Sequence, residues 1–500
     1  MNKYQLGELR NGTPVLPSEE RKNILLLADD MRFPSGVGTM SREIVLGTCH
    51  HFNWIQIGGA AHHPDAGKIV QMDKSVASET GVEDPSVLVY GVNGYGEPRM
   101  LRHLIKQHKI DAIFHFTDPR FWEWLYRMNG ELKTQLPLIY YDLWDDLPFP
   151  HYNTAFYQSC DMLLNINRQT HQLVKSLLEE KNVHDLYYPS KGNPDYSKIL
   201  LDYVPHGINP DVYHPLEDDN DDILKLKRKL FGDKEYDFIV FYNNRNVRRK
   251  MTGDVILAYR DLYLSLDKKQ AEKCALILHT AGRDENGTDL FRIINDLAPD
   301  INIFIDEEKV DLFQMNLLYN IADVTINLAS NEGFGLSSAE SIMAGTMVLN
   351  NITGGLQDHL RFEDEKGEWI KFTEEFPSNH NGRYKKCGEW GIPVFPKTRS
   401  LLGSIPTPYI FDDRCDWEDA GDGLKELYKL SKIQRREKAL KGREWLKSDE
   451  SRMSASKMSE LISKDIKLLL DNWKPKKAFE LIDTKNLNKP KVVGILKKAK

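Results

Sequence analysis

Cysteine is scarce in this sequence, with five residues in a chain of 500. The five lie far apart and form no CxxC pair, which argues against a disulfide framework and against a zinc ribbon. We therefore expect reduced thiols and a cytoplasmic protein. The residues are Cys49, Cys160, Cys274, Cys387 and Cys415.

Long apolar runs are missing as well. No stretch reaches 18 apolar residues, so we expect no transmembrane helix. The first 23 residues are polar and lack the apolar centre of a signal peptide. The net charge of −7 gives no reason to expect a polyanionic partner.

What is present is an ordinary globular mixture, with 41% hydrophobic and 28% charged residues. This is enough apolar material for more than one core. A chain of 500 residues suggests two to four domains, and two large ones are the simplest case.

Short apolar runs alternate with helical patterns along the first 200 residues. A break at 204–222 is rich in proline, glycine, asparagine and acids and reads as a linker. The alternation then restarts, so we predict an α/β protein with two Rossmann-like doubly wound domains facing a central cleft. The expected strands are 23–29, 111–116, 136–142, 160–167, 237–244, 274–281, 301–306, 324–330 and 346–351.

We divide the chain into a first domain (1–205), a second domain (206–445) and a C-terminal part (446–500) of helices and a basic tail. The helices are expected to return to the first domain. The segment 361–412, rich in glycine, proline and aromatic residues, breaks the rhythm. A loop of this length is either functional or a misassigned element.

One stretch, "TINLASNEGFGLSSAESIMAGTMVLNN" at 325–351, places Glu332 and Glu340 with seven residues between them. The pattern predicts a strand, a turn and a helix over 337–344. "Ser337-Ser338-Ala339-Glu340" fits a capping box, in which the glutamate only satisfies helix amides. That interpretation of Glu340 stands beside a ligand-binding one.

Glu332 lies in the turn, beside glycines that let a ligand approach the backbone. The first amides of the following helix, at Gly335, Leu336 and Ser337, form an anion site. Carboxylates accept hydrogen bonds from sugar hydroxyls. A ligand with both anionic and hydroxyl-rich parts, such as a nucleotide sugar, fits both features.

Cations follow the first expected strand of the second domain, in "NNRNVRRKMTGD". Open α/β sheets bind ligands at the carboxyl ends of their strands. We expect Arg245 and Lys250 to contact phosphate, and Arg248 and Arg249 to be solvated.

These segments resemble the retaining glycosyltransferases of the GT-B fold, and most closely family 4 (glycosyl transferases group 1). Four segments carry the resemblance in the family's order. The specificity lies in their combination, which covers about residues 204–358. They are "VPHGINPDVYHP", "NNRNVRRKMTGD", the segment with two glutamates, and "TGGLQD" at 353–358.

The resemblance implies roles for individual residues. Arg245, Lys250 and Glu332 would be catalytic, with Glu332 near the transferred sugar. Glu340 would bind the ribose, and the backbone of Phe334, Gly335 and Leu336 would meet phosphate or sugar. Gly36 and Gly38, in "PSGVGTM", would approach the diphosphate or the acceptor, although a plain strand-to-helix turn explains this loop equally well.

The first domain departs from the family pattern. Many members carry a His-Asp pair where this chain has Tyr141 and Asp142. Either of these, or Asp118, could replace the histidine on the acceptor side. The acids of "DLWDD" are interpreted as solvated, and neither a metal nor a cofactor is expected.

The implied activity is transfer of a sugar from a UDP- or GDP-linked donor to an acceptor hydroxyl. The acceptor stays open among glycan, lipid-linked, protein and nucleic-acid hydroxyls, and the basic tail leaves a peripheral membrane contact open. Competing interpretations are a nucleotide-sugar epimerase, a sugar phosphorylase and a non-catalytic binding module. The oligomeric state is not predicted.

Overall fold

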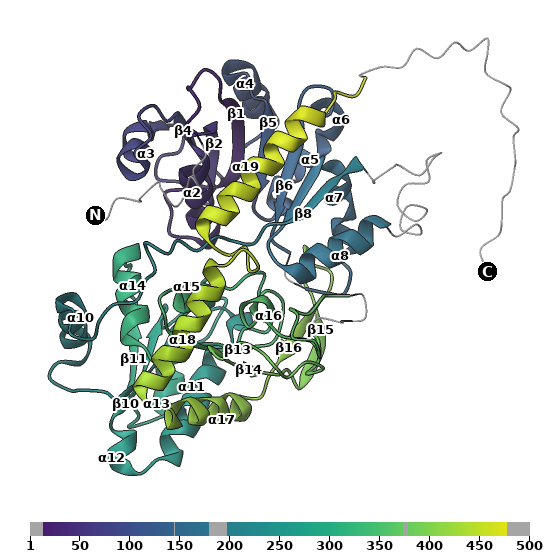
Figure 1. Cartoon of the computed structure of the whole chain (residues 1–500). Helices are drawn as coiled ribbons and strands as arrows, with labels where there is room; N and C mark the ends of the chain where they lie inside the picture. The colour runs from purple at the N-terminus through teal and green to yellow at the C-terminus, as the bar shows by residue number, and fades with distance from the viewer. Residues whose placement is uncertain (1–13, 145, 180–197, 374–375, 377–378, 478–500) are drawn as a thin grey trace, which may run out of the picture.

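The computed structural model describes residues 14–144, 146–179, 198–373, 376 and 379–477. Two units, each built on a mainly parallel sheet, are stacked one above the other (Figure 1). The basic tail beyond residue 477 lies outside the described residues.

The first unit holds an eight-stranded sheet in the order β3-β4-β2-β1-β5-β6-β7-β8. Its pairs are parallel except for β3 with β4. The central strands are buried on both faces, which explains their continuous apolar runs. The strands are β1 (Lys22–Asp29), β2 (Phe52–Ala60), β3 (Ile69–Gln71), β4 (Val87–Asn93), β5 (Ala112–Phe116), β6 (Leu138–Asp142), β7 (Met162–Asn165) and β8 (Leu200–Tyr203).

Helices cover both faces of this sheet (Figure 1). The helix after β1 begins where the Ser35 side chain accepts a hydrogen bond from the Gly38 amide, as an N-cap serine does. The helical segments are α2 (Gly36–Thr48), α3 (Asp73–Thr80), α4 (Pro98–His108), η1 (Pro119–Trp122), α5 (Glu123–Arg127), α6 (Asn129–Leu132), η2 (His151–Asn153), α7 (Thr154–Ser159) and α8 (Arg168–Glu179).

The second unit holds a six-stranded parallel sheet in the order β11-β10-β9-β12-β13-β14. Its strands are β9 (Phe238–Asn243), β10 (Cys274–His279), β11 (Ile303–Asp306), β12 (Val324–Asn327), β13 (Met347–Asn351) and β14 (Gly391–Val394). Its helical segments are α10 (Asp221–Phe231), η4 (Arg248–Lys250), α11 (Thr252–Ser265), α12 (Lys268–Ala271), α13 (Leu290–Leu297), α14 (Leu312–Ile321), α15 (Leu336–Met343), α16 (Leu356–His359) and α17 (Trp417–Lys429).

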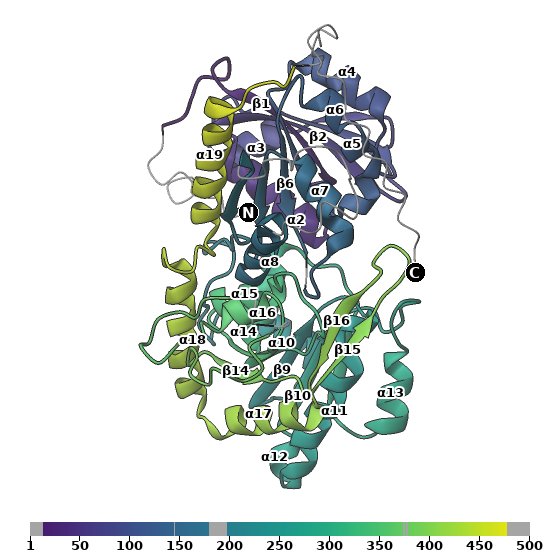
Figure 2. The same ribbon diagram turned by 90° about the vertical axis from the view of Figure 1, so that its right-hand side faces the viewer.

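The last two helices connect the units. α18 (Lys432–Lys447) packs against α15 in the second unit, whereas α19 (Ala455–Asn472) packs against α2 in the first. They lie one after the other along one side of the molecule (Figures 1 and 2). The predicted return of the C-terminal helices to the first domain is confirmed.

The segment 361–412 is not one long loop. β14 lies within it and extends the sheet beside β13. It is followed by an antiparallel hairpin of β15 (Thr398–Leu402) and β16 (Ile410–Arg414). The hairpin reaches the first unit (Figure 2), where the Tyr152 hydroxyl donates to the Tyr409 carbonyl at 2.7 Å.

The carboxyl edges of the two sheets meet. A Cβ atom built on Gly36, after β1, would lie 3.4 Å from Cδ1 of Leu336, after β12. The Asn167 side chain, after β7, donates to the Gly333 carbonyl at 2.6 Å. The loops that follow the strands therefore face one another between the units. Within the described part of the chain, no helix is long and apolar enough to cross a membrane.

Candidate functional site

The helix that follows β12 starts at Leu336, one residue before its predicted start. Its N-cap is Gly335, with φ +92°, a conformation that glycine adopts without strain. No side chain caps this end, so the capping-box interpretation of Ser337 and Glu340 is wrong. The first N–H groups of a helix have no helical partner, so they are available to a ligand.

Lys250 and Glu332 form a buried ion pair beside this helix start. The two residues are 7% and 8% exposed. The 3₁₀ helix η4 delivers Lys250 after β9, and the turn after β12 delivers Glu332. Burial alone would raise the pKa of Glu332, but the charges of Lys250 and Arg249 hold it below its usual range. Glu332 is therefore an anion at neutral pH.

Glu340 has a different environment one turn into α15. Its Oε2 accepts a hydrogen bond from the Tyr319 hydroxyl at 2.7 Å, and the Tyr319 hydroxyl also accepts one from Asn243 Nδ2 at 2.9 Å. Burial raises the pKa of Glu340, and the hydroxyls of Tyr319 and Tyr213 partly offset that rise. This carboxylate, held by hydroxyls and not by cations, can accept hydrogen bonds from a diol.

The basic residues of 245–250 are arranged differently from the sequence expectation. Arg245 pairs with Asp284 at 2.9 Å and its side chain is 67% exposed. Arg249, expected to be solvated, donates to the Asn331 carbonyl at 2.8 Å and lies 3.9 Å from the Glu332 carboxylate. Arg249 and Lys250 are therefore the cations nearest to Glu332, and sequence reasoning missed Arg249.

Phe334 lies between two histidines. Its ring centroid is 5.0 Å from that of His206, in the linker, and 4.8 Å from that of His359, in α16. Burial lowers the pKa of each histidine to about 3, so both are neutral at pH 7. No pattern in the sequence singled out either histidine.

The two glycines of the first loop have different surroundings. Gly36 faces Leu336 across the junction of the units. Gly38 donates its amide to Ser35 Oγ at 2.9 Å, and a Cβ atom there would lie 2.5 Å from the Phe33 carbonyl oxygen. The amide of Gly38 thus stabilises its own turn, which favours the plain strand-to-helix interpretation for this residue.

The three acceptor-side candidates make separate contacts. The Tyr141 hydroxyl is fully buried and lies 2.9 Å from His206 Nδ1. Asp142 is also buried and accepts from the Trp144 amide at 3.1 Å. Asp118 caps η1 and pairs with Arg120. Tyr141 and Asp142 therefore support the interior of the first unit, and Asp118 positions an arginine.

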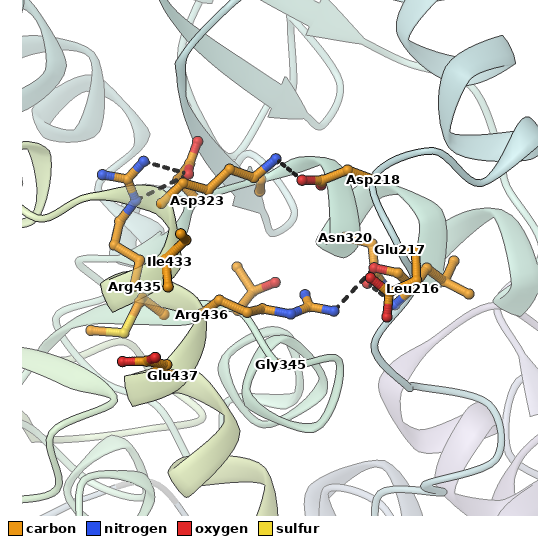
Figure 3. Close-up of a pocket in the computed structure, with 14 residues that line it drawn as sticks. Leu216, Glu217, Asp218, Asn320, Asp323, Gly345, Ile433, Arg435, Arg436 and Glu437 are labelled. Carbon is orange, nitrogen blue, oxygen red and sulfur yellow. Dashed lines mark hydrogen bonds and ion pairs between the residues drawn. The ribbon is translucent and has the colours of Figure 1, made fainter.

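A cavity of about 250 Å³ lies at the opposite, amino-terminal edge of the second sheet (Figure 3). Its cations already have partners. Lys432 pairs with Asp218 at 2.6 Å, and Arg435 pairs with Asp323 at 2.8 Å. This cavity lies away from the two glutamates and is not part of the candidate site.

Metal-ligating residues do not gather in the chain as described. Over 14–144, 146–179, 198–373, 376 and 379–477, no three histidine, cysteine or acidic side chains are placed to hold a metal ion. All five cysteines lie within the described residues, and none of them forms a disulfide.

No family model matches the chain, and no curated protein matches its sequence. Solved structures do match. The chain is similar to the Anabaena protein HepE in complex with UDP and glucose, at 12% identity and TM-score 0.59, over 90% of this chain and 100% of that one. It is also similar to a sucrose-phosphate synthase from Thermosynechococcus elongatus, at 13% identity and TM-score 0.60, again over 90% and 100%.

A third match is an alpha,alpha-trehalose-phosphate synthase (UDP-forming) from Burkholderia vietnamiensis. The identity is 11% and the TM-score 0.57, over 90% of this chain and 99% of that one. Identities this low establish the architecture alone. The chain has the GT-B fold, with two Rossmann-like units meeting at the carboxyl edges of their sheets.

Proposed function

We propose that this chain transfers a sugar from a nucleotide diphosphosugar to an acceptor hydroxyl, with retention of the anomeric configuration, as a glycosyltransferase similar to family 4. One observation carries the proposal: a buried Lys250–Glu332 pair lies beside the open start of α15, and a hydroxyl-bound Glu340 lies one turn further on. The Lys250 ammonium and the first amides of α15 suit a diphosphate. The carboxylates of Glu332 and Glu340 suit the hydroxyl groups of the sugar and the ribose on either side of it.

In the proposed step, the bond between the anomeric carbon and the diphosphate breaks as the acceptor oxygen bonds on the same face. The acceptor proton passes to the leaving phosphate oxygen, so no separate base is needed. Negative charge grows on the leaving group, where Lys250, Arg249 and the start of α15 stabilise it. Arg245 joins them once its exposed side chain leaves Asp284.

The Glu332 carboxylate would accept a hydrogen bond from a hydroxyl of the transferred sugar while Lys250 turns toward the phosphate. The Glu340 carboxylate would accept hydrogen bonds from the ribose hydroxyls. Contact between the units, through Gly36 and Leu336, would exclude water from the reacting centre. The UDP bound to HepE and the UDP-forming reaction of the trehalose-phosphate synthase favour a nucleotide-linked donor. We also propose a cytoplasmic activity that needs neither a metal nor a cofactor; what supports the metal-independent step is the positive charge that Lys250, Arg249 and the start of α15 supply at the donor site.

The test is a transfer assay with a panel of nucleotide sugars and acceptors, read by release of nucleoside diphosphate and by NMR of the product anomer. Lys250→Met and Arg249→Ala should lower turnover by about 100-fold, a typical loss for a group that stabilises transition-state charge. Lys425→Met is the matched control for Lys250, since Lys425 pairs with Asp261 at 2.6 Å away from the site. Arg248→Ala is the control for Arg249.

Other outcomes would support a different enzyme. Conversion of a nucleotide sugar to its epimer without acceptor would indicate an epimerase. Sugar phosphate released from a disaccharide, dependent on inorganic phosphate, would indicate a phosphorylase. Binding of a nucleotide sugar without any turnover would indicate a binding module.

A further inference from the structure

Three polar residues end three neighbouring strands of the second sheet. Asn243, His279 and Asp306 are the last residues of β9, β10 and β11, and the strand registers place Asn243 beside His279 and His279 beside Asp306. Side chains at paired positions of neighbouring strands point to the same face. The three therefore form a row along the carboxyl edge, on the face where Asn243 contacts Tyr319.

The row of Asn243, His279 and Asp306 extends the donor site from β12 toward β11 along the carboxyl edge of the sheet. The open start of α15 and Glu332 follow β12, and the Glu340–Tyr319–Asn243 chain leads from there to β9. The sheet order then gives β10 and β11. From β12 to β11 there are three strand spacings, about 14 Å in all. An extended nucleoside diphosphate with phosphates at β12 and ribose at β9 places its base over β10 and β11.

His279 and Asp306 form a pair in that position. His279 Nδ1 lies 2.8 Å from Asp306 Oδ2, and each side chain is 13% exposed, so a small ligand can reach both. Burial alone would raise the pKa of Asp306, but hydrogen bonds from His279 and the Glu308 amide hold it below its usual range. Because an ionised carboxylate only accepts hydrogen bonds, His279 Nδ1 donates to Asp306, and this contact fixes the orientation of the carboxylate.

Asp306 still presents acceptor positions to a ligand. An ionised carboxylate has about four acceptor positions, and His279 and the Glu308 amide occupy two of them. Guanine offers two adjacent donors, N1–H and the 2-amino group. Uracil offers one N–H between two carbonyl oxygens, which the carboxylate repels. Adenine and cytosine each place an amino group next to an acceptor nitrogen.

We propose that Asp306, oriented by His279, selects guanine and so makes the donor a GDP-linked sugar. This inference rests on the proposed function, because it takes the ribose position from Glu340. The UDP bound to HepE does not decide the base here, since its 12% identity with this chain establishes the fold alone.

The first test is calorimetry of the full chain with GDP, UDP and ADP. GDP should bind at least about 10-fold more tightly than either competitor, the discrimination expected of a two-point base contact. Equal or tighter binding of UDP or ADP would overturn the assignment of guanine and leave the proposed transferase intact. Failure of all three to bind would overturn the donor site itself, and the base assignment with it.

The second test compares two substitutions that each remove one negative charge. Asp306→Asn keeps the shape but turns one acceptor into a donor, so GDP affinity should fall about 10-fold while UDP affinity stays within about twofold. The control is Asp218→Asn, which breaks an ion pair at the opposite edge of the same sheet (Figure 3). An equal loss of GDP and UDP affinity in Asp306→Asn, or the same GDP loss in the control, would contradict base recognition by Asp306.

Discussion

Lys250 and Glu332 join two loops that are 82 residues apart in the chain, and their side chains are only 9% and 11% exposed. The pair connects the end of β9 to the end of β12. A buried pair of this kind costs free energy to desolvate, and removing one partner leaves an uncompensated charge. Its position beside the start of α15 is consistent with a site that is kept charged for a ligand.

The first prediction concerns stability. Lys250→Met should lower the free energy of unfolding by about 3 kcal/mol, because Glu332 would remain buried and its ion pair with Arg249 spans 3.9 Å. Adding Glu332→Gln should recover part of this loss. Urea denaturation followed by circular dichroism measures it. Lys425→Met, which breaks a more exposed pair with Asp261, should cost at most about 1 kcal/mol. A loss below that value for Lys250→Met would mean that the pair is not desolvated in solution.

The second prediction is that acid weakens nucleotide binding through Glu340. The pKa of this carboxyl is raised above the ordinary 4.5, mainly by burial, so its ionised form is lost earlier on acidification than that of a free glutamate. A protonated carboxyl has less capacity to accept hydrogen bonds from the ribose. Affinity for GDP and UDP, measured by calorimetry from pH 7.5 downward, should therefore fall while the pH is still above 4.5.

Glu340→Gln should bind more weakly and lose this dependence. Glu332→Gln should keep it, because the pKa of Glu332 is lowered and this group stays ionised over the same range. A wild-type affinity that is flat down to pH 4.5 would exclude Glu340 from the ribose contact.

Much of the fold was predictable because parallel strands that are buried on both faces appear as unbroken apolar runs. β1, β5, β9 and β10 were all found in this way. β2 (FNWIQIGGA) mixes polar residues and glycines, and β8 (LLDY) is a half-buried edge strand, so neither produced the pattern. β14 contains Pro393, which a sheet tolerates at its edge, and its aromatic surroundings read as a loop.

The site was predictable only where local sequence determines it. The turn and helix around Glu332 and Glu340 follow from glycines and spacing. The choice between Arg245 and Arg249 does not, because it depends on η4 turning Arg249 and Lys250 toward the neighbouring loop. His206 and His359 are 153 residues apart in the chain, and tertiary packing brings both rings against Phe334.

The third prediction compares those two histidines. Within the described residues, neither ring nitrogen of His359 has a hydrogen-bond partner, and the side chain is fully buried. His359→Phe removes two unpaired polar atoms and should raise the free energy of unfolding by about 1 kcal/mol. His206→Phe should instead lower it by about 1–2 kcal/mol, because the buried Tyr141 hydroxyl loses its 2.9 Å partner and keeps a long, weak contact with Met458 Sδ. Thermal denaturation of both variants measures these changes in stability. Equal destabilisation by the two would contradict the difference in hydrogen bonding between His206 and His359.

The last prediction concerns the contact between the units. Asp146 from the first unit and Asp413 from the second both reach the Thr353 hydroxyl, with Oδ2 atoms 3.2 and 3.1 Å from it. Burial and then the charge of Asp413 raise the pKa of Asp146 well above its usual range. In the closed form, in which the two units are in contact, Asp146 therefore keeps a proton that it would lose at the same pH in an open form with separated units.

The direction of the pH effect on closure follows from the raised pKa of Asp146. A group whose pKa is raised stabilises the closed form at low pH and loses that contribution as the pH rises toward the raised value, by about 1.4 kcal/mol per pH unit. The radius of gyration from small-angle scattering, measured without ligand in a pH series from acidic to alkaline, should thus increase with pH as the units separate. In the Asp146→Asn variant the side chain at this position does not titrate, so the protein should remain compact across the same pH series. A wild-type radius that does not change with pH, or an Asp146→Asn variant that still expands, would show that this carboxyl pair does not control closure.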